Sequence, residues 1–434
     1  MEDLPRGWRE VAFADVVADV RNGLSAKPAD QPPGLPILRI SAVRARRINL
    51  QDARFHRDAG VDAQPYLLRN RDLLFVRYNG TPDLTAACGM VRSLDADCVY
   101  PDKLIRVRVD ESTALPEFVE LAMTTEAARK RLQAHIKTAA GQHGISGRDL
   151  LRVKLPLPPL AEQRRIVARI EALFARTRRA RAELERVEKL AAQCVTRALE
   201  QAFDAGGQPQ ALKPVSDLAS AQLGKMLDAA KNTDGRPLPY LRNINVRWFG
   251  FDLSDLLTMR FTEEEAIKFT IRDDDVFVCE GGEPGRAAVW HGGATDIKFQ
   301  KALHRLRPKA DVEPDWLALG LRYLADSGQL ADHFTGTTIK HLPGQALAAV
   351  RLPLFPLEEQ RARITAFQRT SKRIETQCNE TARALALLDR LDAAILARAF
   401  RGELVPQDPA DEPARLSHPL AAIARPRRRA ASPA

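Results

Sequence analysis

The sequence predicts an α+β protein in which two similar mixed α/β domains are joined by two long helices. The helices are expected to pair as an antiparallel coiled coil around a pseudo-two-fold axis. Three observations predict this arrangement. Residues 153–203 align without a gap with residues 350–400, and 16 of these 51 positions are identical. Each copy contains a long segment free of Pro and Gly, and short β-like runs precede each copy.

The constant offset of 197 residues divides the chain into five segments. A repeat this long indicates two domains with separate cores rather than a solenoid. The tail is rich in Ala and Pro, so we expect it to be partly disordered and its RPRRR run to be solvated. In chain order the segments are a first domain (1–152), a Pro-rich lead-in with the first spacer helix (153–205), a second domain (206–349), a second lead-in with its spacer helix (350–403) and a C-terminal tail (404–434).

Within the two domains, turn signals separate short apolar runs that predict strands. Helical pieces are expected near residues 116–134 and 314–331, and each domain then ends in a polar, glycine-bearing loop at 137–146 and 334–342. The predicted strands lie at 37–40, 73–76, 104–109, 275–279 and 287–290.

Prolines before each spacer segment, at 156, 158 and 159 and at 353 and 356, predict a stiff extended lead-in. A heptad seam follows, and 44 residues of helix would be about 66 Å long. A helix with one apolar stripe needs a partner, and the other copy is the nearest one. Two alternatives are a helix packed on its own domain and a parallel coil between chains. The seam positions are Ile166, Ile170, Leu173, Leu184 and Val187, then Ile364, Phe367, Ile374, Leu385, Leu388, Leu391 and Ile395.

The net charge of +10 is concentrated in the spacer segments. Residues 151–205 and 351–434 each carry +5, whereas residues 1–150 carry +2 and residues 206–350 carry −2. Near-neutral domains predict weak DNA binding by the chain alone, unless charge is gathered on one face. No apolar run approaches the roughly 18 residues of a membrane span. The start of the chain lacks a secretory pattern, and the five scattered cysteines favour a reducing cytoplasm.

Side chains near the polar loops are the candidates for reading DNA, because Arg, Lys, Asn and Gln pair with base edges and phosphates. An ordinary surface role is the alternative for each of them. The candidates of the first domain are Arg77, Tyr78, Asn79, Lys103, Lys137 and His143, and those of the second are Glu280, Arg286, Gln300, Lys301, Lys340 and His341.

No catalytic or metal-binding motif is apparent. A phosphate-binding GxxxxGK[ST] loop, an HExxH pair and a methyltransferase NPPY-like motif are all missing from the sequence. The fragment Asp296-Ile-Lys298 is too loose a pattern to indicate a nuclease. We therefore predict no catalytic residue and no metal ligand in this chain.

Three sets of residues resemble the specificity (S, HsdS) subunit of type I restriction–modification enzymes. The first is LPLPPLAEQRRIVARIEALF (155–174) with its echo LPLFPLEEQRARI (352–364). The second is RAFRGELVPQDPADEPA (398–414), and the third is EGGEPGRAAVW (280–290) with FQKALHRLRP (299–308). Together with the repeat, the resemblance covers roughly residues 5–414.

The resemblance implies that each domain is a target recognition domain reading one half of a split, asymmetric DNA site. The coiled coil would set the gap and dock two methyltransferase (M, HsdM) subunits that methylate adenine N6. The chain would bind no cofactor; S-adenosylmethionine, ATP and Mg²⁺ would belong to the methyltransferase and the restriction (R, HsdR) subunits. Residues 77–82 (RYNGTP) replace the EGG-type loop of the second domain, which fits two domains reading different sequences.

Three other interpretations remain open at this point. A modification-only system would use the same chain without a restriction subunit. A coiled-coil scaffold with two protein-binding domains would have no role on DNA. A fused nuclease or methyltransferase would require motifs that the sequence lacks.

Overall fold

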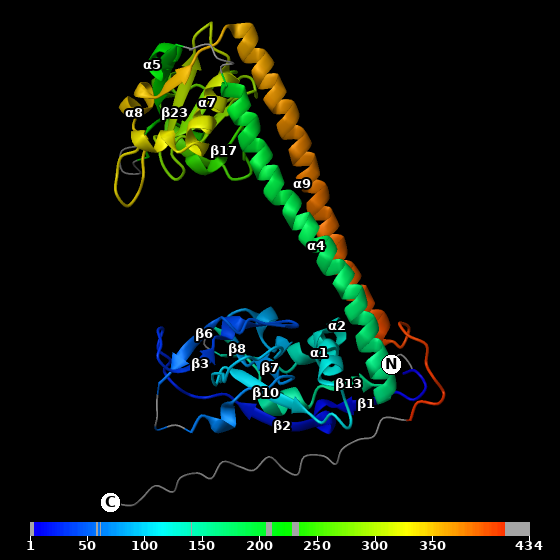
Figure 1. Cartoon of the computed structure of the whole chain (residues 1–434). Helices are drawn as coiled ribbons and strands as arrows, with labels where there is room; N and C mark the ends of the chain where they lie inside the picture. The colour runs from blue at the N-terminus through cyan, green and yellow to red at the C-terminus, as the bar shows by residue number, and fades with distance from the viewer. Residues whose placement is uncertain are drawn as a thin grey trace, which may run out of the picture. The chain divides into compact units, whose positions relative to one another are not determined.

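The computed structural model describes residues 4–57, 60, 62–139, 141–204, 211–227 and 234–412. The chain forms two compact units (Figure 1). Unit 1 comprises Met1–Glu183 and Ala384–Ala434, and unit 2 comprises Leu184–Arg383. Each unit therefore holds one globular domain, called domain 1 and domain 2 below, together with parts of both long helices.

A four-stranded antiparallel sheet with the order β2-β10-β7-β9 is the centre of domain 1. The side chains of β7 (Leu73–Val76) alternate between two cores: Leu73 and Phe75 pack with α1, whereas Leu74 and Val76 pack on the opposite side. Both faces of this strand are buried, which explains its unbroken apolar run. The other three strands are β2 (Val17–Asn22), β9 (Cys88–Met90) and β10 (Leu104–Val109).

The remaining elements of domain 1 surround this sheet. The predicted helical piece at 116–134 is in fact two helices, because Thr125 ends the first and its hydroxyl caps the second by accepting from the Ala128 amide. These are α1 (Pro116–Thr124) and α2 (Glu126–Gln133), and α3 (Gly147–Leu151) follows. The short strands are β1 (Arg9–Ala12), β3 (Leu35–Leu38), β4 (Val43–Arg44), β5 (Arg47–Ile48), β6 (Ala53–His56), β8 (Tyr78–Asn79), β11 (Lys137–Ala139), β12 (Gln142–Gly144) and β13 (Lys154–Leu157).

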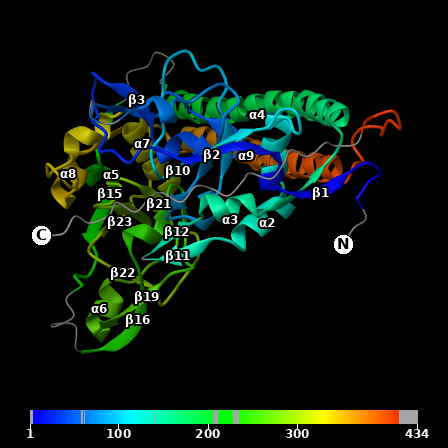
Figure 2. The same ribbon diagram turned by 90° about the horizontal axis from the view of Figure 1, so that it is seen from below.

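Domain 2 repeats this plan with the sheet order β15-β23-β20-β21. Val276 and Val278 of β20 face one core, and Phe277 and Cys279 face the other. Figure 2 shows β16 and β19 side by side next to α6. The strands are β14 (Leu212–Pro214), β15 (Ala219–Leu223), β16 (Arg236–Leu241), β17 (Val246–Arg247), β18 (Gly250–Phe251), β19 (Leu257–Phe261), β20 (Val276–Cys279), β21 (Ala287–Val289), β22 (Lys298–Phe299), β23 (Leu303–Pro308) and β24 (Arg351–Pro353). The helices are α5 (Val215–Leu218), α6 (Glu263–Lys268), α7 (Pro314–Asp326) and α8 (Gly344–Ala349).

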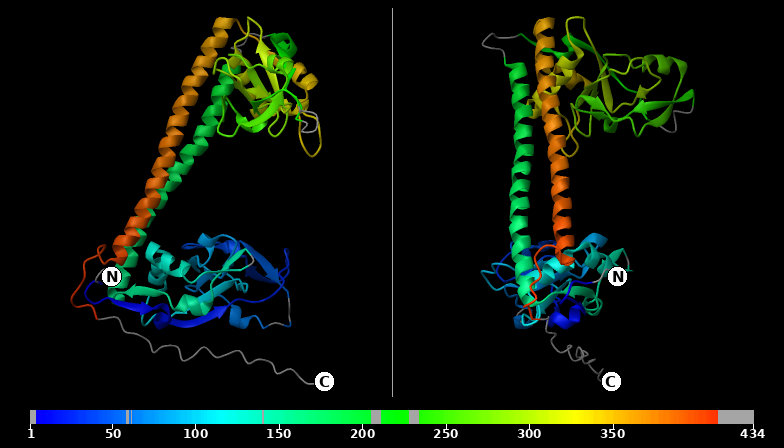
Figure 3. Two further views of the ribbon diagram at one scale, coloured as in Figure 1. Left: turned by 180° about the vertical axis from the view of Figure 1, so that it is seen from behind. Right: turned by 90° about the vertical axis from the view of Figure 1, so that its right-hand side faces the viewer.

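The long helices α4 (Leu160–Phe203) and α9 (Leu357–Phe400) begin and end at the offset seen in the sequence, and each has 44 residues. Within each unit they lie side by side (Figure 3). In unit 1 the Thr177 hydroxyl donates to Asp392 over 2.8 Å, and Arg181 pairs with Asp389 at 2.9 Å. The residue numbers rise along α4 as they fall along α9, so the pairing is antiparallel.

A repeated glutamine explains why the PLxEQR motif occurs at the start of both helices. Gln163 is fully buried; its carbonyl oxygen accepts from the Leu115 amide at 2.8 Å, and its amide donates to Thr113 and Pro158 carbonyls. Gln360 makes the same three bonds to Glu313, Asp311 and Phe355. Each glutamine thus fixes the start of a long helix to its own domain.

The described residues also place the seam and the lead-ins. Ile166, Ile170, Ile364, Phe367 and Ile395 are buried, while Leu173, Leu184, Val187, Ile374, Leu385 and Leu388 are half-buried. Leu391 does not lie in the seam, since its side chain is 48% exposed and Asp392 contacts α4 instead. Both proline-rich lead-ins form strands, β13 pairing with β1 and β24 with β14.

Part of the predicted tail is ordered against unit 1. Leu404 and Val405 pack on its core, and Asp411 pairs with Arg165 of α4 at 2.6 Å. Residues 413–434, including Arg425–Arg429, lie outside the described residues. No helix in the described part of the chain is long and apolar enough to cross a membrane.

Candidate nucleic-acid interface

Five of the six candidate residues of domain 1 converge on one small sheet with the order β11-β12-β8. The loop predicted at 137–146 is a β-hairpin, called hairpin 1 (residues 137–144), in which Thr138 pairs with His143. His143 pairs in turn with Asn79 of β8. Arg77, Tyr78, Asn79, Lys137 and His143 therefore share this sheet or directly adjoin it. Lys103 is exposed beside them, and its carbonyl accepts from the Arg77 amide at 2.8 Å.

Local contacts fix the side chains around β8. The Arg77 guanidinium lies over the Tyr78 ring, 4.8 Å from its centroid, and donates to the Asp102 carbonyl. Gly144 is required opposite Tyr78, because a Cβ there would be 2.5 Å from the ring. The Thr138 hydroxyl and His143 Nδ1 are 2.9 Å apart. The result is a small polar platform with an exposed lysine, Lys137, at its edge.

Domain 2 places its candidates around a matching hairpin, called hairpin 2 (residues 335–341). Thr335 and His341 exchange two backbone hydrogen bonds of 2.8 and 2.9 Å. His341 also bridges to Gly281, as His143 pairs with Asn79 in domain 1. The Glu280 amide donates to the Ala302 carbonyl, which brings the loop containing Gln300 and Lys301 alongside. Lys301, Lys340 and His341 are exposed, and Glu280 and Gln300 are half-buried.

Arg286 is held inside domain 2. Its side chain is 13% exposed, pairs with Glu283 at 2.7 Å and donates to the Asn243 carbonyl at 2.8 Å. Glu283 also accepts from the Trp248 indole. These bonds engage both terminal nitrogens of the guanidinium, which holds the loop 280–286 against the 243–248 segment.

A buried polar frame lies behind each platform. In domain 1 the Asp72 carboxylate accepts from the Arg69 amide and from Arg108, whose Nε is 2.8 Å away. In domain 2 Asp275 accepts in the same way from the Arg272 amide and from Arg307 at 2.7 Å. Next to Arg307, burial lowers the pKa of Arg305 to about 10. The frame holds neighbouring strands and the 65–72 and 268–275 turns together in both domains.

Two side chains at the hairpin tips were not among the predicted residues. Gln142 is exposed in hairpin 1, and Ile339 is exposed in hairpin 2. Both lie in segments that the composition predicts as loops, and only the backbone pairing places Gln142 in hairpin 1 and Ile339 in hairpin 2.

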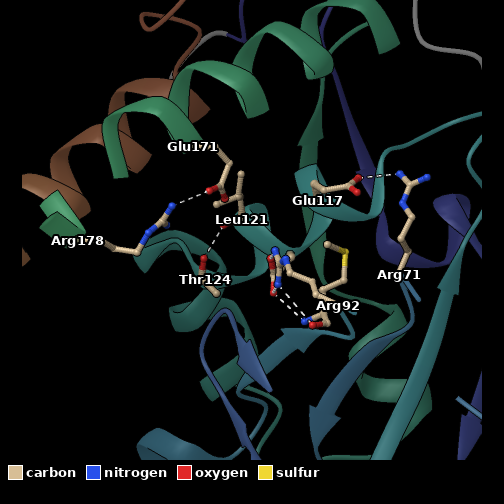
Figure 4. Close-up of polar contacts among 9 residues, drawn as sticks. Arg71, Arg92, Glu117, Leu121, Thr124, Glu171 and Arg178 are labelled. Atoms are coloured by element: carbon tan, nitrogen blue, oxygen red, sulfur yellow. Dashed lines mark hydrogen bonds and ion pairs between the residues drawn. The ribbon is translucent and has the colours of Figure 1, made fainter. Parts of the chain in front are cut away.

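A pocket of about 340 Å³ in unit 1 contains charged groups that are paired with one another. Arg71 pairs with Glu117 at 2.7 Å, Arg92 with the buried Glu120, and Glu171 of α4 with Arg178 at 3.4 Å (Figure 4). These pairs connect α1, the sheet edge and α4, so the pocket is explained by packing. Among the described residues no group of three His, Cys, Asp or Glu side chains is arranged to hold a metal ion.

Comparison with known proteins shows what this chain is similar to. Residues 5–189 match the type I restriction modification DNA specificity domain. The specificity subunit of the type I restriction enzyme EcoBI of Escherichia coli is 24% identical over 441 residues, covering 94% of this chain and 88% of that protein. The chain is thus similar to the specificity subunits of type I restriction enzymes.

Other specificity subunits match a shorter region. That of EcoKI from Escherichia coli is 41% identical over 169 residues, which is 39% of this chain and 36% of that protein. The chain thus spans little more than a third of the length of this relative in the match.

Two solved structures share the fold of this chain. A chain from a study of complex assembly and conformational transition of the type I R-M system has a TM-score of 0.72 at 22% identity, covering 93% of this chain and all (100%) of that one. The HsdS subunit from Thermoanaerobacter tengcongensis has a TM-score of 0.55 at 24% identity, covering 92% and 98%. The predicted fold class is therefore confirmed.

Proposed function

We propose that this chain is a specificity subunit of a type I restriction–modification system that reads a bipartite, asymmetric DNA site, one half through each domain. The observation that supports this most strongly is that two copies of one frame carry different hairpins at the same place. Asp72 with Arg108 and Asp275 with Arg307 keep the frame, whereas hairpin 1 presents Gln142 and hairpin 2 presents Ile339. Different side chains on one scaffold are expected of two readers of different sequences.

The paired helices α4 and α9 are proposed to set the gap between the half-sites. Deletion of one heptad from the middle of α4, matched by one in α9, would shorten the pair by about 10 Å. The gap in the recognised site should then shrink by about three base pairs, since one turn of DNA spans about 34–36 Å. Retention of the original gap would contradict this role.

The exposed faces of α4 and α9 indicate that two copies of one partner bind. Beyond the PLxEQR motif, identical exposed residues recur at the 197-residue offset and lie within one helical stripe. Exposed positions are not constrained by packing, so their identity in the two copies indicates two copies of one partner, which we propose to be methyltransferase subunits. The stripe consists of Arg176, Glu183, Arg186 and Leu190 on α4 and Arg373, Glu380, Arg383 and Leu387 on α9.

This proposal is tested by the stoichiometry of the complex. Leu190 is 49% exposed and Leu387 is 59% exposed, so Asp at either position should be tolerated by the fold. Each single variant is expected to bind one methyltransferase subunit instead of two by native mass spectrometry, and the double variant none. Ala192→Asp, an exposed position of α4 outside the stripe, is the matched control and should keep two. Two subunits on the double variant would refute the assignment.

Chemistry is proposed to reside in the partners. Methyltransferase subunits would supply adenine-N6 methylation with S-adenosylmethionine, and restriction subunits would supply ATP- and Mg²⁺-dependent translocation and cleavage. The five cysteines are free thiols, and a cytoplasmic location, where thiols stay reduced, is part of this proposal.

Methylome sequencing tests the function directly. A host expressing this chain with its neighbouring methyltransferase gene should show adenine methylation at one split motif, and deletion of this chain should abolish it. An active methyltransferase complex without any motif would favour the scaffold interpretation. Methylation without restriction of unmodified phage would identify a modification-only system.

A further inference from the structure

We propose that Ile339 contacts the C5 methyl group of a thymine in the half-site read by domain 2, and so determines part of its specificity. The inference rests on the proposed DNA-reading function. It names one side chain of hairpin 2 and one chemical group of the DNA.

The turn of hairpin 2 has a defined conformation. Thr335 and His341 close it with backbone hydrogen bonds of 2.8 and 2.9 Å. Gly336 has a φ of +90°, and a Cβ there would lie 2.2 Å from the Ile339 carbonyl oxygen. Only glycine fits this close approach, so the turn that presents Ile339 is specified by the sequence.

The base of the hairpin is tied to the body of domain 2. His341 bridges to Gly281, and the Leu342 amide donates to the Glu280 carbonyl at 2.7 Å. The imidazole Nε2 of buried His304 lies 3.0 Å from the Leu342 carbonyl and donates to it. A ribbon held at its base in this way can position one side chain at its tip reproducibly.

Ile339 itself is 66% exposed although it is a β-branched apolar residue. Thr337, Thr338 and Lys340 around it are exposed and polar. Hairpin 2 is a narrow loop closed by one antiparallel bridge, and the major groove, which admits a two-stranded ribbon, presents the thymine methyl as an apolar group that distinguishes its base pair. Lys340 would lie close enough to attract backbone phosphate. Polar neighbours for phosphates and one aliphatic group for a methyl suit DNA better than an apolar protein surface.

Hairpin 1 supplies the contrast. Its tip presents the exposed amide of Gln142, paired across the ribbon with Ala139, and no exposed large aliphatic side chain among its described residues. An amide pairs with the N6 and N7 edge of adenine rather than with a methyl group. The loss of affinity that follows replacement of a thymine by uracil should therefore depend on Ile339 and not on Gln142.

The test uses the complex of this chain with its methyltransferase subunits and duplexes carrying the methylome-defined site. Each thymine is replaced singly by uracil, which removes only the methyl group. For the unsubstituted complex, one uracil in one half-site should lower affinity about fourfold, as expected for one buried methyl group. Ile339→Ala should bind the thymine duplex about fourfold more weakly and no longer distinguish uracil from thymine at that position.

Matched variants separate this effect from others. Ile267→Ala removes a 75% exposed isoleucine from α6 of the same domain and should retain the uracil effect, as should Gln142→Ala. Ile339→Val is a conservative second variant that keeps a branched methyl and should retain part of the discrimination. If Ile339→Ala fails to fold, Ile339→Val and the uracil series still decide the question.

Three results would overturn the inference. They are sequence-specific binding that is indifferent to every uracil, a uracil effect that persists in Ile339→Ala, and loss of methyltransferase subunits from Ile339→Ala, which would make Ile339 a protein contact. Failure of the proposed function looks different, because the complex would then bind no sequence preferentially.

Discussion

Domains 1 and 2 share a frame that is repeated almost bond for bond, and they differ where the hairpins end. The Asp72–Arg108 and Asp275–Arg307 pairs have Nε–O distances of 2.8 and 2.7 Å, and Gln163 and Gln360 make equivalent sets of three hydrogen bonds. Hairpin 1 ends in an amide side chain and hairpin 2 in an aliphatic one. The two domains thus differ in the side chains at the ends of their hairpins, while the buried polar hydrogen bonds of the frame are the same.

The helix ends should reveal the largest difference between the units. The Phe203 ring centroid lies 4.5 Å from that of Trp316, with the rings tilted, and it stacks on Tyr323 at 4.8 Å, whereas Phe400 lies 5.1 Å from Phe118 and is only partly buried. Phe203→Ala is expected to cost unit 2 about 4 kcal/mol, and Phe400→Ala to cost unit 1 about 2 kcal/mol. Hydrogen exchange resolved by peptide measures each unit separately. Equal losses would show that the second aromatic contact contributes nothing.

The buried Asp–Arg pairs of the frame predict equal losses of stability in the two domains. Asp72→Ala and Asp275→Ala should each destabilise their own domain by about 3 kcal/mol, because each leaves a half-buried arginine and a backbone amide without their acceptor. Local hydrogen exchange of β7 and β20 reports the two effects. Glu126→Ala, which removes an exposed ion pair with Lys130, is the control and should cost far less, because solvent screens exposed ion pairs. If Asp72→Ala or Asp275→Ala lost no more stability than this control, the two frames would not be equivalent.

The hairpin lysines should act alike because phosphate attraction does not depend on base sequence. Lys137→Ala and Lys340→Ala are each expected to weaken DNA binding by the assembled complex a few-fold at every site. Each should also lower the slope of log affinity against log salt by about 0.9. Fluorescence anisotropy over a salt series measures both quantities. A change of recognised motif in either variant would instead assign that lysine to base reading.

Acid should produce the smallest difference and affect hairpin 2 alone. Burial lowers the pKa of His304, so the folded domain favours the neutral ring, and its protonation in the unfolded chain near pH 6.5 opposes folding as the pH falls. The stabilisation is complete above that pH and is lost below it. The corresponding strand of domain 1 carries Ile105. Protection of the amides of residues 335–342, taken as the exchange rate relative to the intrinsic rate at each pH, should fall from pH 7 to 5.5, and His304→Gln, which donates without titrating, should suppress the fall.

Much of the fold could be predicted because its signals are local. The absence of Pro and Gly between 160 and 203 gave both ends of α4, and the repeat transferred them to α9. The phase of the seam near Leu391 could not be predicted, since polar bonds from Asp392 to Thr177 override the apolar pattern there. The break of the 116–134 helix at Thr125 depends on a side-chain cap that helix propensity does not reveal.

The candidate interface was only partly predictable for a similar reason. Residues far apart in the sequence, such as Asn79 and His143, meet through strand pairing that the loop-like composition of 137–146 conceals. Arg286 has the chemistry of a base reader, but its partners Glu283 and the Asn243 carbonyl are set by tertiary structure. Residue type therefore pointed to candidate positions, and long-range contacts decided which of those side chains are exposed.

Exchange of the hairpins tests the central claim most directly. Residues 335–341 would be replaced by residues 138–143, whose closing Thr and His match, and the methylome of a host with the partner methyltransferase would be sequenced. One half of the split motif should change, while the other half and the gap remain as they were. An unchanged motif, or a change in both halves or in the gap, would contradict the account of two independent readers on one repeated frame.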